Sequence, residues 1–201
     1  MAAERIAILG GTFDPPHLGH LALATGVADA MGLDKVLLVP TGNPHFKLDK
    51  KVTPVEDRVA MVELMAAVDT RLQVSRIEVD REGITYTVDT LKELLAENPG
   101  AELLFIVGGD CIGHIWRWRA ADELAKLCTV VAVERRGFDY AADQEKLRAS
   151  GIDFNVEYLS FDVPEVSSTD IRECVAAGES LSALVLPSVA DYIRAHELYS
   201  A

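Results

Sequence analysis

The sequence predicts an α/β fold: a doubly wound, mostly parallel sheet covered by helices on both faces, with a small helical C-terminal part. Short apolar runs alternate with amphipathic helical patterns along the chain, which is typical of parallel strands buried on both faces. The chain has 201 residues, 49% of them hydrophobic, enough to bury a substantial core in one domain. We therefore treat residues 1–201 as a single domain, with residues 167–201 as a candidate helical C-terminal subdomain.

Six apolar runs are the expected strands, and helices fit between them. The runs are Arg5 to Leu9, Lys35 to Val39, Leu72 to Val79, Leu103 to Val107, Thr129 to Val133 and Asn155 to Leu159. Ligands of doubly wound sheets gather beyond the carboxyl ends of strands, so the segments that follow these runs are the candidates for a site.

Two helices have clear sequence signals. In the helix after the second run, Thr53 is the expected N-cap, Pro54 the first helical residue and Glu56 the partner in a capping box. Its apolar face should pack on the sheet through Val59, Val62, Leu64 and Met65. The last helix is expected to start near Pro187. The spacing of its apolar residues Val189, Tyr192 and Ile193 predicts that they face the core.

Charge and cysteine content exclude several classes of function. The chain has 32 acidic and 19 basic residues, and its net charge of −13 argues against broad binding to nucleic acid or anionic membranes. The three cysteines (Cys111, Cys128 and Cys174) form no CxxC pair, so a disulfide framework or a metal site is not expected. No basic leader or long apolar span is present, and we expect a cytoplasmic protein.

The most informative segment runs from Gly10 to His20 and reads GGTFDPPHLGH. It follows the apolar run Ile6–Leu9 and opens a helical pattern, as expected of a phosphate site at a strand-to-helix turn. On a helix, the spacing of His17 and His20 places both imidazoles on one face, where they can address one phosphate group. A helix-capping or packing role is the alternative for these histidines.

A second informative segment, Pro164 to Arg172, reads PEVSSTDIR near the C-terminus. Serine and threonine at a helix start can cap the helix while amides and hydroxyls bind phosphate, and Arg172 adds a forked cation one turn later. A generic N-cap would explain Ser167 or Ser168 without any ligand.

Together and in this order, the two segments resemble the (H/T)xGH signature and the ISSTxIR block of the nucleotidylyltransferase superfamily, and more narrowly the nicotinate mononucleotide adenylyltransferases. The resemblance spans Ile6 to Arg172. It implies a Rossmann-like fold and transfer of the adenylyl group of ATP to nicotinate mononucleotide, giving nicotinate adenine dinucleotide and pyrophosphate in NAD biosynthesis. The implied partners are ATP, the mononucleotide and Mg²⁺ that enters with ATP.

The resemblance also implies roles for individual residues. The catalytic set, which neutralises charge on the phosphates, is His17, His20, Lys47 and Arg172. Residues expected to hold ATP or its phosphates are Gly10, Gly11, Thr12, Phe13, Gly19, Gly108, Asp110, Arg135, Ser167, Ser168 and Thr169. Gly19 would allow the nucleotide to approach the helix closely. No protein nucleophile is implied, because the phosphate oxygen of the mononucleotide attacks the α-phosphorus directly.

The mononucleotide is expected to lie near Tyr86, Thr87 and Trp118. Thr87 would bind a carboxylate through its hydroxyl or nearby amides, although a helix cap at Thr87 or Asp89 is an alternative. Counting from Asp110, the family's ring-stacking tryptophan is Trp118 rather than Trp116, on the helix expected after the fourth strand. Arg76 and Arg81 are expected to form surface salt bridges.

The chain departs from the family pattern at His45, Phe46 and Arg136. In the two loops that contain these departures, the resemblance therefore implies site roles only for Lys47 and Arg135. Three other activities stay open: adenylyl transfer to nicotinamide mononucleotide, transfer to phosphopantetheine, and a non-catalytic nucleotide sensor. The phosphopantetheine enzymes lack the block that reads Tyr-Thr-x-Asp-Thr here. Sequence does not determine the oligomeric state, so a homo-oligomer stays open, and residues 139–155 offer no functional signal.

Overall fold

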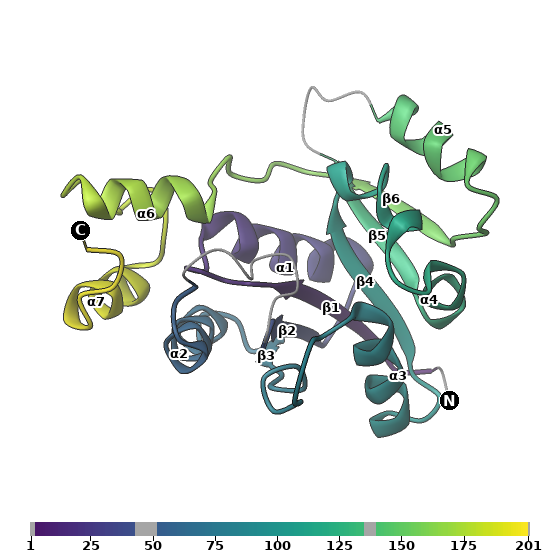
Figure 1. Ribbon diagram of the computed structural model, residues 1–201, viewed down its shortest axis with the longest axis horizontal. Helices are drawn as coiled ribbons and strands as arrows, with labels where there is room; N and C mark the ends of the chain where they lie inside the picture. The colour runs from purple at the N-terminus through teal and green to yellow at the C-terminus, as the bar shows by residue number, and fades with distance from the viewer. Residues whose placement is uncertain (1–2, 43–51, 135–139, 201) are drawn as a thin grey trace.

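The computed structural model describes residues 3–42, 52–134 and 140–200 (Figure 1). Its centre is a six-stranded parallel sheet with the strand order β3-β2-β1-β4-β5-β6. The strands are β1 (Arg5–Gly11), β2 (Val36–Pro40), β3 (Leu72–Val74), β4 (Glu102–Gly108), β5 (Thr129–Glu134) and β6 (Val156–Ser160). The predicted fold class is confirmed. Because the strand order reverses beside β1, the carboxyl ends of β1 and β4 border the crevice in which such sheets bind ligands.

Helices cover both faces of this sheet (Figure 1). One face packs against α1 (Leu18–Met31) and α2 (Val55–Ala66), and the other against α3 (Thr87–Glu97), α4 (Ala121–Leu127) and α5 (Ala141–Ala149). Side chains along β1 point alternately to the two faces of the sheet. Ile6 and Ile8 pack in the α3–α5 core, and Ala7 and Leu9 pack in the α1–α2 core. Strands buried on both faces explain the continuous apolar runs in the sequence.

The helices α6 (Ser168–Ala176) and α7 (Pro187–Ala195) form a third hydrophobic cluster with α2. Its buried members are Met61, Ile171, Val185, Val189 and Ile193. Figure 1 shows α6 and α7 at the end of the molecule opposite α4 and α5. The last helix has Pro187 at its first position, as predicted. Treating residues 167–201 as a subdomain stays a prediction.

The predicted strand Leu72 to Val79 is wrong in length, because β3 ends at Val74. The Ser75 amide still donates to the Leu38 carbonyl, but the Asp80 amide then bonds the Arg76 carbonyl and closes a turn. β3 is also an edge strand, paired only with β2, so fewer hydrogen bonds hold it extended. Likewise, Trp116 lies in a short 3₁₀ turn, Ile115–Arg117, rather than on the expected helix.

The predicted cap of α2 is also wrong. Pro54, not Thr53, is the N-cap, and no side chain caps this helix. Pro54 itself has extended backbone, with ψ of 141°, so the helix begins one residue later, and both backbone groups of Thr53 bond elsewhere, to Asp14 and Arg58. Of the apolar face, Val62 and Met65 pack on the sheet and Val59 is buried, whereas the half-buried Leu64 packs against the third cluster.

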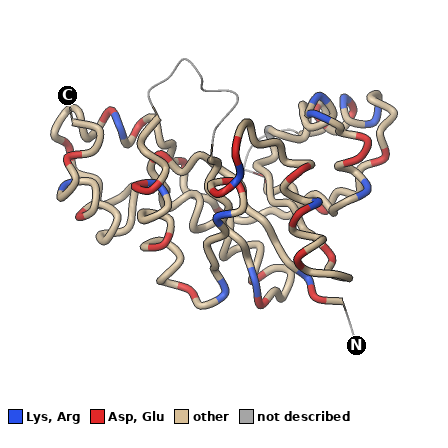
Figure 2. The backbone as a smooth tube through the Cα atoms, turned by 60° about the horizontal axis from the view of Figure 1, so that its bottom comes forward, with Lys and Arg blue, Asp and Glu red and all other residues tan. Residues whose placement is uncertain are grey.

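Charged residues of both signs alternate along the surface segments (Figure 2). Several form local ion pairs, including Arg71 with Asp69 and Asp29, both at 2.6 Å, and Lys92 with Glu123 at 2.7 Å. Among the helices described, none combines the length and apolar character needed to cross a membrane. The cysteines Cys111, Cys128 and Cys174 form no disulfide.

Candidate active site

The glycine turn, the most informative segment of the sequence, leads from β1 into α1. His17 is the N-cap of α1, and its Nδ1 accepts a hydrogen bond from the His20 amide at 3.3 Å. In return, His20 Nδ1 accepts from the His17 amide at 3.3 Å, which closes a capping box built from two imidazoles. The rings stack with their centroids 3.7 Å apart. The capping role left open by the sequence is therefore present.

Capping also fixes the chemistry that His20 offers to a ligand. Because Nδ1 accepts a hydrogen bond, the neutral ring carries its proton on Nε2 and can donate from there. Burial and the neighbouring His17 lower the pKa of His20 to about 3, so this ring is neutral at pH 7. In the free protein, His20 therefore offers a neutral hydrogen-bond donor, and its role toward phosphate stays a prediction.

The buried side chain of Arg58 anchors the loop between β1 and α1. Nothing in the sequence distinguishes this arginine from other helical arginines. Arg58 is 1% exposed although it carries a charge. Its guanidinium donates to the carbonyls of Thr12 at 2.7 Å, Thr41 at 2.8 Å and Thr53 at 3.1 Å. One buried side chain thus joins the loop after β1, the end of β2 and the start of α2.

Phe13 has an unusual backbone conformation within this loop, with φ of 49°. For a residue with a side chain, the left-handed region costs about 1–2 kcal/mol. The cost is tolerated because the ring is 1% exposed, packs in the α1–α2 core and lies 4.7 Å from the His20 ring. Strain that surrounding contacts enforce is common at functional loops.

The second motif meets the first at this loop, although the two lie about 150 residues apart in sequence. Ser168 Oγ donates to the Pro15 carbonyl at 2.9 Å, and Arg172 Nη1 donates to the Asp14 carbonyl at 2.7 Å. Ser167 is the N-cap of α6 and accepts from the Asp170 amide at 3.2 Å. The start of α6 and the glycine turn therefore form one structural unit.

Two further predicted residues have local partners. Thr169 Oγ1 accepts from Arg172 Nη2 at 3.1 Å, which sets the direction of the guanidinium. A Cβ on Gly19 would lie 3.0 Å from His17 Nδ1 and 3.2 Å from the Pro164 carbonyl, so packing alone favours glycine there. Close approach of a nucleotide to Gly19 stays a prediction.

A hollow of about 280 Å³ opens beside the glycine turn, at the carboxyl ends of β1 and β2 and next to Phe105 of β4. The predicted residues Gly10, Gly11, Thr12, Thr87 and Trp118 line it, together with Glu78, Thr85, Thr90 and Phe105. Trp118 meets Phe105 edge to face, with ring centroids 5.9 Å apart. Residues predicted to bind phosphate and residues predicted to bind the mononucleotide thus share one cavity.

Trp118 and Trp116 have different surroundings. Trp118 lines both this hollow and a second one, of about 530 Å³, that includes Tyr86, His114 and Arg119. Trp116 packs against the core, and its Nε1 donates to the Gly113 carbonyl at 3.0 Å. Both rings also pack against the α3–α5 core, and the choice of Trp118 as the residue that meets a ligand stays a prediction.

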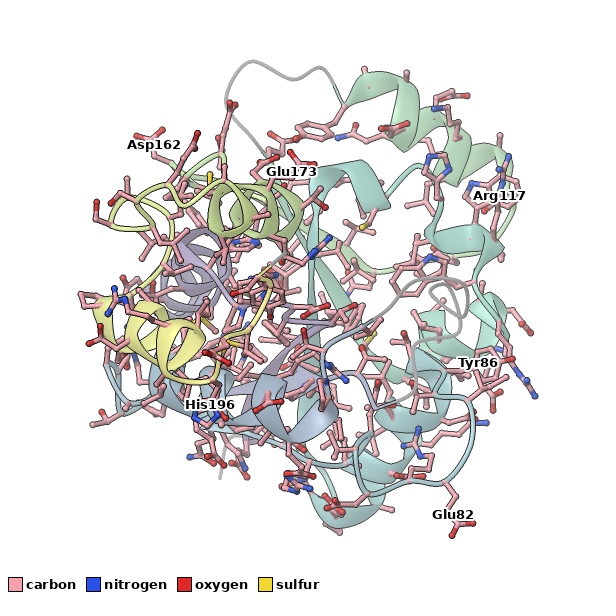
Figure 3. The ribbon with its side chains drawn as sticks, turned by 60° about the vertical axis from the view of Figure 1, so that its left-hand side comes forward. Glu82, Tyr86, Arg117, Asp162, Glu173 and His196 are labelled. Carbon is pink, nitrogen blue, oxygen red and sulfur yellow. The ribbon has the colours of Figure 1, made fainter. Side chains whose placement is uncertain are left out.

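Tyr86 is the N-cap of α3, so neither Thr87 nor Asp89 caps this helix; Thr87 is its first residue. The guanidinium of Arg119 lies over the Tyr86 ring, 4.2 Å from its centroid. In Figure 3, Tyr86 and Arg117 lie on the opposite side of the view from Glu173 and His196, which belong to the α6–α7 region. The two ends of the site are thus built by different parts of the chain.

Glu78 is a second residue whose place the sequence did not reveal. It is 9% exposed on the wall of the 280 Å³ hollow, and its Oε1 accepts from the Thr90 hydroxyl at 2.8 Å. Burial raises the pKa of this carboxyl, and the hydrogen bond from Thr90 partly offsets the rise. The burial of Glu78 has no short-range signal in the sequence.

Other predicted residues are placed only in part. Gly108 is the last residue of β4. Asp110 lies in the 3₁₀ turn Gly109–Cys111, and its side chain is not among the described groups. Lys47 and Arg135, and with them His45, Phe46 and Arg136, lie outside the described residues.

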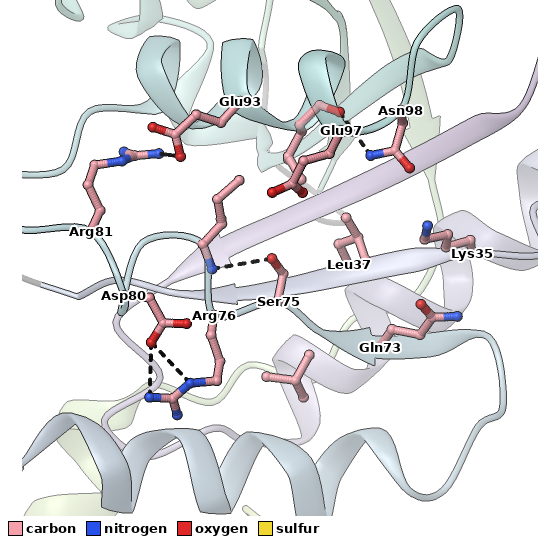
Figure 4. Close-up of a pocket in the computed structure, with 13 residues that line it drawn as sticks. Lys35, Leu37, Gln73, Ser75, Arg76, Asp80, Arg81, Glu93, Glu97 and Asn98 are labelled. Carbon is pink, nitrogen blue, oxygen red and sulfur yellow. Dashed lines mark hydrogen bonds and ion pairs between the residues drawn. The ribbon is translucent and has the colours of Figure 1, made fainter.

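A larger groove, of about 780 Å³, lies elsewhere on the protein (Figure 4). Its arginines are already paired: Arg76 binds Glu56 at 2.8 Å and Asp80 at 3.2 Å, and Arg81 binds Glu93 at 2.6 Å. The predicted salt bridges of Arg76 and Arg81 are confirmed. None of the residues that line this groove belongs to the two sequence motifs.

Fold and site together define a class: an α/β protein with a glycine-containing strand-to-helix turn at the carboxyl ends of a parallel sheet, where such proteins bind ligands. A family model described as cytidylyltransferase-like matches residues 8–174. The chain therefore belongs to the cytidylyltransferase-like family and, by the relatives described next, to its nicotinate-nucleotide adenylyltransferase branch.

Two relatives cover nearly all of the chain, and both carry the name "Probable nicotinate-nucleotide adenylyltransferase". The protein from Leifsonia xyli is 45% identical over 196 residues, which is 97% of this chain and 94% of that protein. The protein from Corynebacterium kroppenstedtii is 43% identical over 195 residues, 97% and 90% of the two chains. The solved structure of the Plasmodium falciparum nicotinic acid mononucleotide adenylyltransferase complexed with NaAD has a similar fold, with a TM-score of 0.79, 21% identity and coverage of 98% and 97%.

Proposed function

We propose that the protein transfers the adenylyl group of ATP to nicotinate mononucleotide. The phosphate oxygen of the mononucleotide attacks the α-phosphorus of ATP, the bond from that phosphorus to the β-phosphate bridge oxygen breaks, and pyrophosphate leaves. The product is nicotinate adenine dinucleotide. The observation that supports this most is the union of the two motifs at one loop, beside a hollow that also contains Trp118.

Catalysis in this scheme depends on alignment and on donors aimed at charged oxygens. Backbone amides after β1 and the Nε2–H of His20 would hold the transferred phosphoryl group, and Arg172 at the start of α6 would add positive charge. His17, Lys47 and the start of α6 extend the same set along the triphosphate. Because His20 is neutral, it would act as a donor in the ground state rather than as a cation.

The mononucleotide would occupy the side of the hollow formed by Thr87 and Trp118. An indole face can stack on a planar pyridine ring, and the free amides at the start of α3 suit the nicotinate carboxylate. Tyr86 lies in the adjoining hollow, where it would border the same ligand. Gly108 and Asp110, at the end of β4, would contact ATP.

Magnesium is the implied metal. Among the described residues no group of three histidine, cysteine or acidic side chains could hold a metal ion, and the donors at the loop suit phosphate oxygens rather than a cation. Mg²⁺ would therefore be held mainly by the phosphates of ATP and would screen their charge. The reduced cysteines fit the cytoplasmic location that we propose.

The test is pyrophosphate release by the purified protein with magnesium ATP and, at matched concentrations, nicotinate mononucleotide, nicotinamide mononucleotide or phosphopantetheine. We expect turnover with the nicotinate substrate. Turnover only with another acceptor would reassign the substrate. ATP binding without pyrophosphate release from any acceptor would instead identify a nucleotide sensor.

A further inference from the structure

We propose that Tyr199 is a positioning residue for adenylyl transfer: through Asp14 and Arg58 it holds the Thr12–Phe13 peptide so that the Phe13 amide faces the triphosphate of ATP. The inference rests on the proposed function, which makes ATP the ligand of this loop. Tyr199 follows α7 and contributes to the third hydrophobic cluster, far in sequence from the loop that it contacts.

The first link joins Tyr199 to the loop. The Tyr199 hydroxyl donates to Asp14 Oδ1 at 2.8 Å, and the Thr53 amide donates to Asp14 Oδ2 at 3.4 Å. Asp14 is 4% exposed, so water contributes little to its solvation and each of these donors matters. Burial raises the pKa of Tyr199, which keeps its hydroxyl protonated and able to donate.

The second link joins Asp14 to Arg58 through Thr53, whose amide donates to Asp14 Oδ2 at 3.4 Å and whose carbonyl accepts from Arg58 Nε at 3.1 Å. Both side chains are buried, and the negative charge of Asp14 favours the charged form of Arg58 against the cost of its burial. With its charge balanced, the guanidinium donates to the Thr12 carbonyl at 2.7 Å. Loss of the Tyr199 hydroxyl would leave Asp14 short of a donor and free to move toward Arg58, away from its present position.

The third link follows from the geometry of the peptide bond. The carbonyl and the N–H of a planar trans peptide point in opposite directions. Since the Thr12 carbonyl points at Arg58, the Phe13 N–H of the same peptide points away from Arg58. No residue in the described parts of the chain accepts a hydrogen bond from this amide, so it is available to a phosphate oxygen.

The protein also contains a matched control. Tyr192 lies in α7, in the same cluster, and its hydroxyl donates to a carboxylate as well, Asp57 Oδ1 at 3.0 Å. Asp57 lies in the first turn of α2 and makes no contact with the loop after β1 among the interactions described. Tyr199→Phe and Tyr192→Phe therefore remove the same chemical group from two similar bonds, and only one of these bonds leads to the phosphate loop.

The experiment compares wild type, Tyr199→Phe and Tyr192→Phe by steady-state kinetics and by thermal unfolding with and without magnesium ATP. We expect Tyr199→Phe to lower kcat/KM for magnesium ATP about tenfold, while KM for the mononucleotide changes less than about twofold. Tyr192→Phe should keep both constants. Kinetics are measured well below the unfolding midpoint of every variant, so that a loss of folded protein does not contribute.

The rise in Tm produced by ATP alone gives a second readout that needs no acceptor. We expect a smaller rise for Tyr199→Phe than for the other two proteins. Equal constants and equal ATP-induced shifts in both variants would overturn the inference, because Tyr199 would then have only a structural role. If wild type releases no pyrophosphate, the proposed function fails, and the ATP-induced shifts still decide whether Tyr199 positions the loop.

Discussion

The two sides of the hollow are built in different ways. On the phosphate side, the loop after β1 is tied to α2, α6 and the segment after α7 by hydrogen bonds from Arg58, Ser168, Arg172 and Tyr199. On the ring side, Trp118 is held by packing against Phe105, at the end of a short 3₁₀ turn. Alignment of phosphates demands fixed donors, whereas a planar ring needs only an apolar face. Variants on the phosphate side should therefore lower stability or turnover, whereas variants of the stacking residue on the ring side should mainly raise KM for the mononucleotide.

The largest effect is expected from breaking the phosphate side at Arg58. Arg58→Met removes a buried charge, leaves the carbonyls of Thr12, Thr41 and Thr53 without this donor and leaves the buried Asp14 without a nearby positive charge, which should cost about 3–5 kcal/mol of unfolding free energy. Arg71→Met is the control, because Arg71 pairs at the surface and should cost about 0–1 kcal/mol. Urea unfolding measures both. Equal losses would contradict the account of a buried clamp.

The next largest effect is expected at His20, where a substitution should lower turnover rather than stability. His20→Ala should lower kcat by about 100- to 1,000-fold, because a preorganised donor to the phosphoryl oxygens is lost. Circular dichroism should show an intact fold, although part of the α1 cap disappears. His196→Ala, at a half-exposed histidine stacked on Tyr192, is the control and should keep its turnover. Near-normal turnover of folded His20→Ala would remove this residue from the mechanism.

The ring side is tested by Trp118→Leu. We expect KM for the mononucleotide to rise about tenfold with a smaller change in KM for ATP, since loss of an aromatic stacking surface costs about 1–3 kcal/mol. Trp116→Leu should lower Tm without raising KM, because this ring packs on the core. A rise in KM for ATP alone in Trp118→Leu would place the adenosine, not the pyridine ring, beside the indole.

The smallest effect is expected from Glu78→Gln, which sharpens the description of the ring side. Burial raises the pKa of Glu78 above its ordinary value of 4.5, so the folded state favours the protonated carboxyl. Stability is therefore lost as pH rises from 4.5 through the raised pKa, and the glutamine variant escapes this loss. Unfolding midpoints at about pH 4 and about pH 8 should show a gain for Glu78→Gln only at the higher pH. A pH-independent difference would contradict the shifted pKa.

Sequence reasoning reached the sheet because its strands are buried on both faces and appear as continuous apolar runs. It missed the early end of β3, where edge pairing rather than composition sets the length. The α2 cap was expected at Thr53, because the hydrogen bonds from the Thr53 amide to Asp14 and from Arg58 to the Thr53 carbonyl have no local signature. The same reason explains the site: Gly10 to His20 and Ser167 to Arg172 are local patterns, whereas Arg58 reads as an ordinary helical arginine and Tyr199 as a core residue.

The most direct test of the account is a crystal structure with nicotinate mononucleotide and an ATP analogue that cannot be cleaved between the α- and β-phosphorus. We expect phosphate oxygens within about 3 Å of the Phe13 amide and of His20 Nε2, and the pyridine ring against Trp118. Phosphates bound away from the loop after β1, for example in the groove of Arg76 and Arg81, or a pyridine ring away from Trp118, would contradict it.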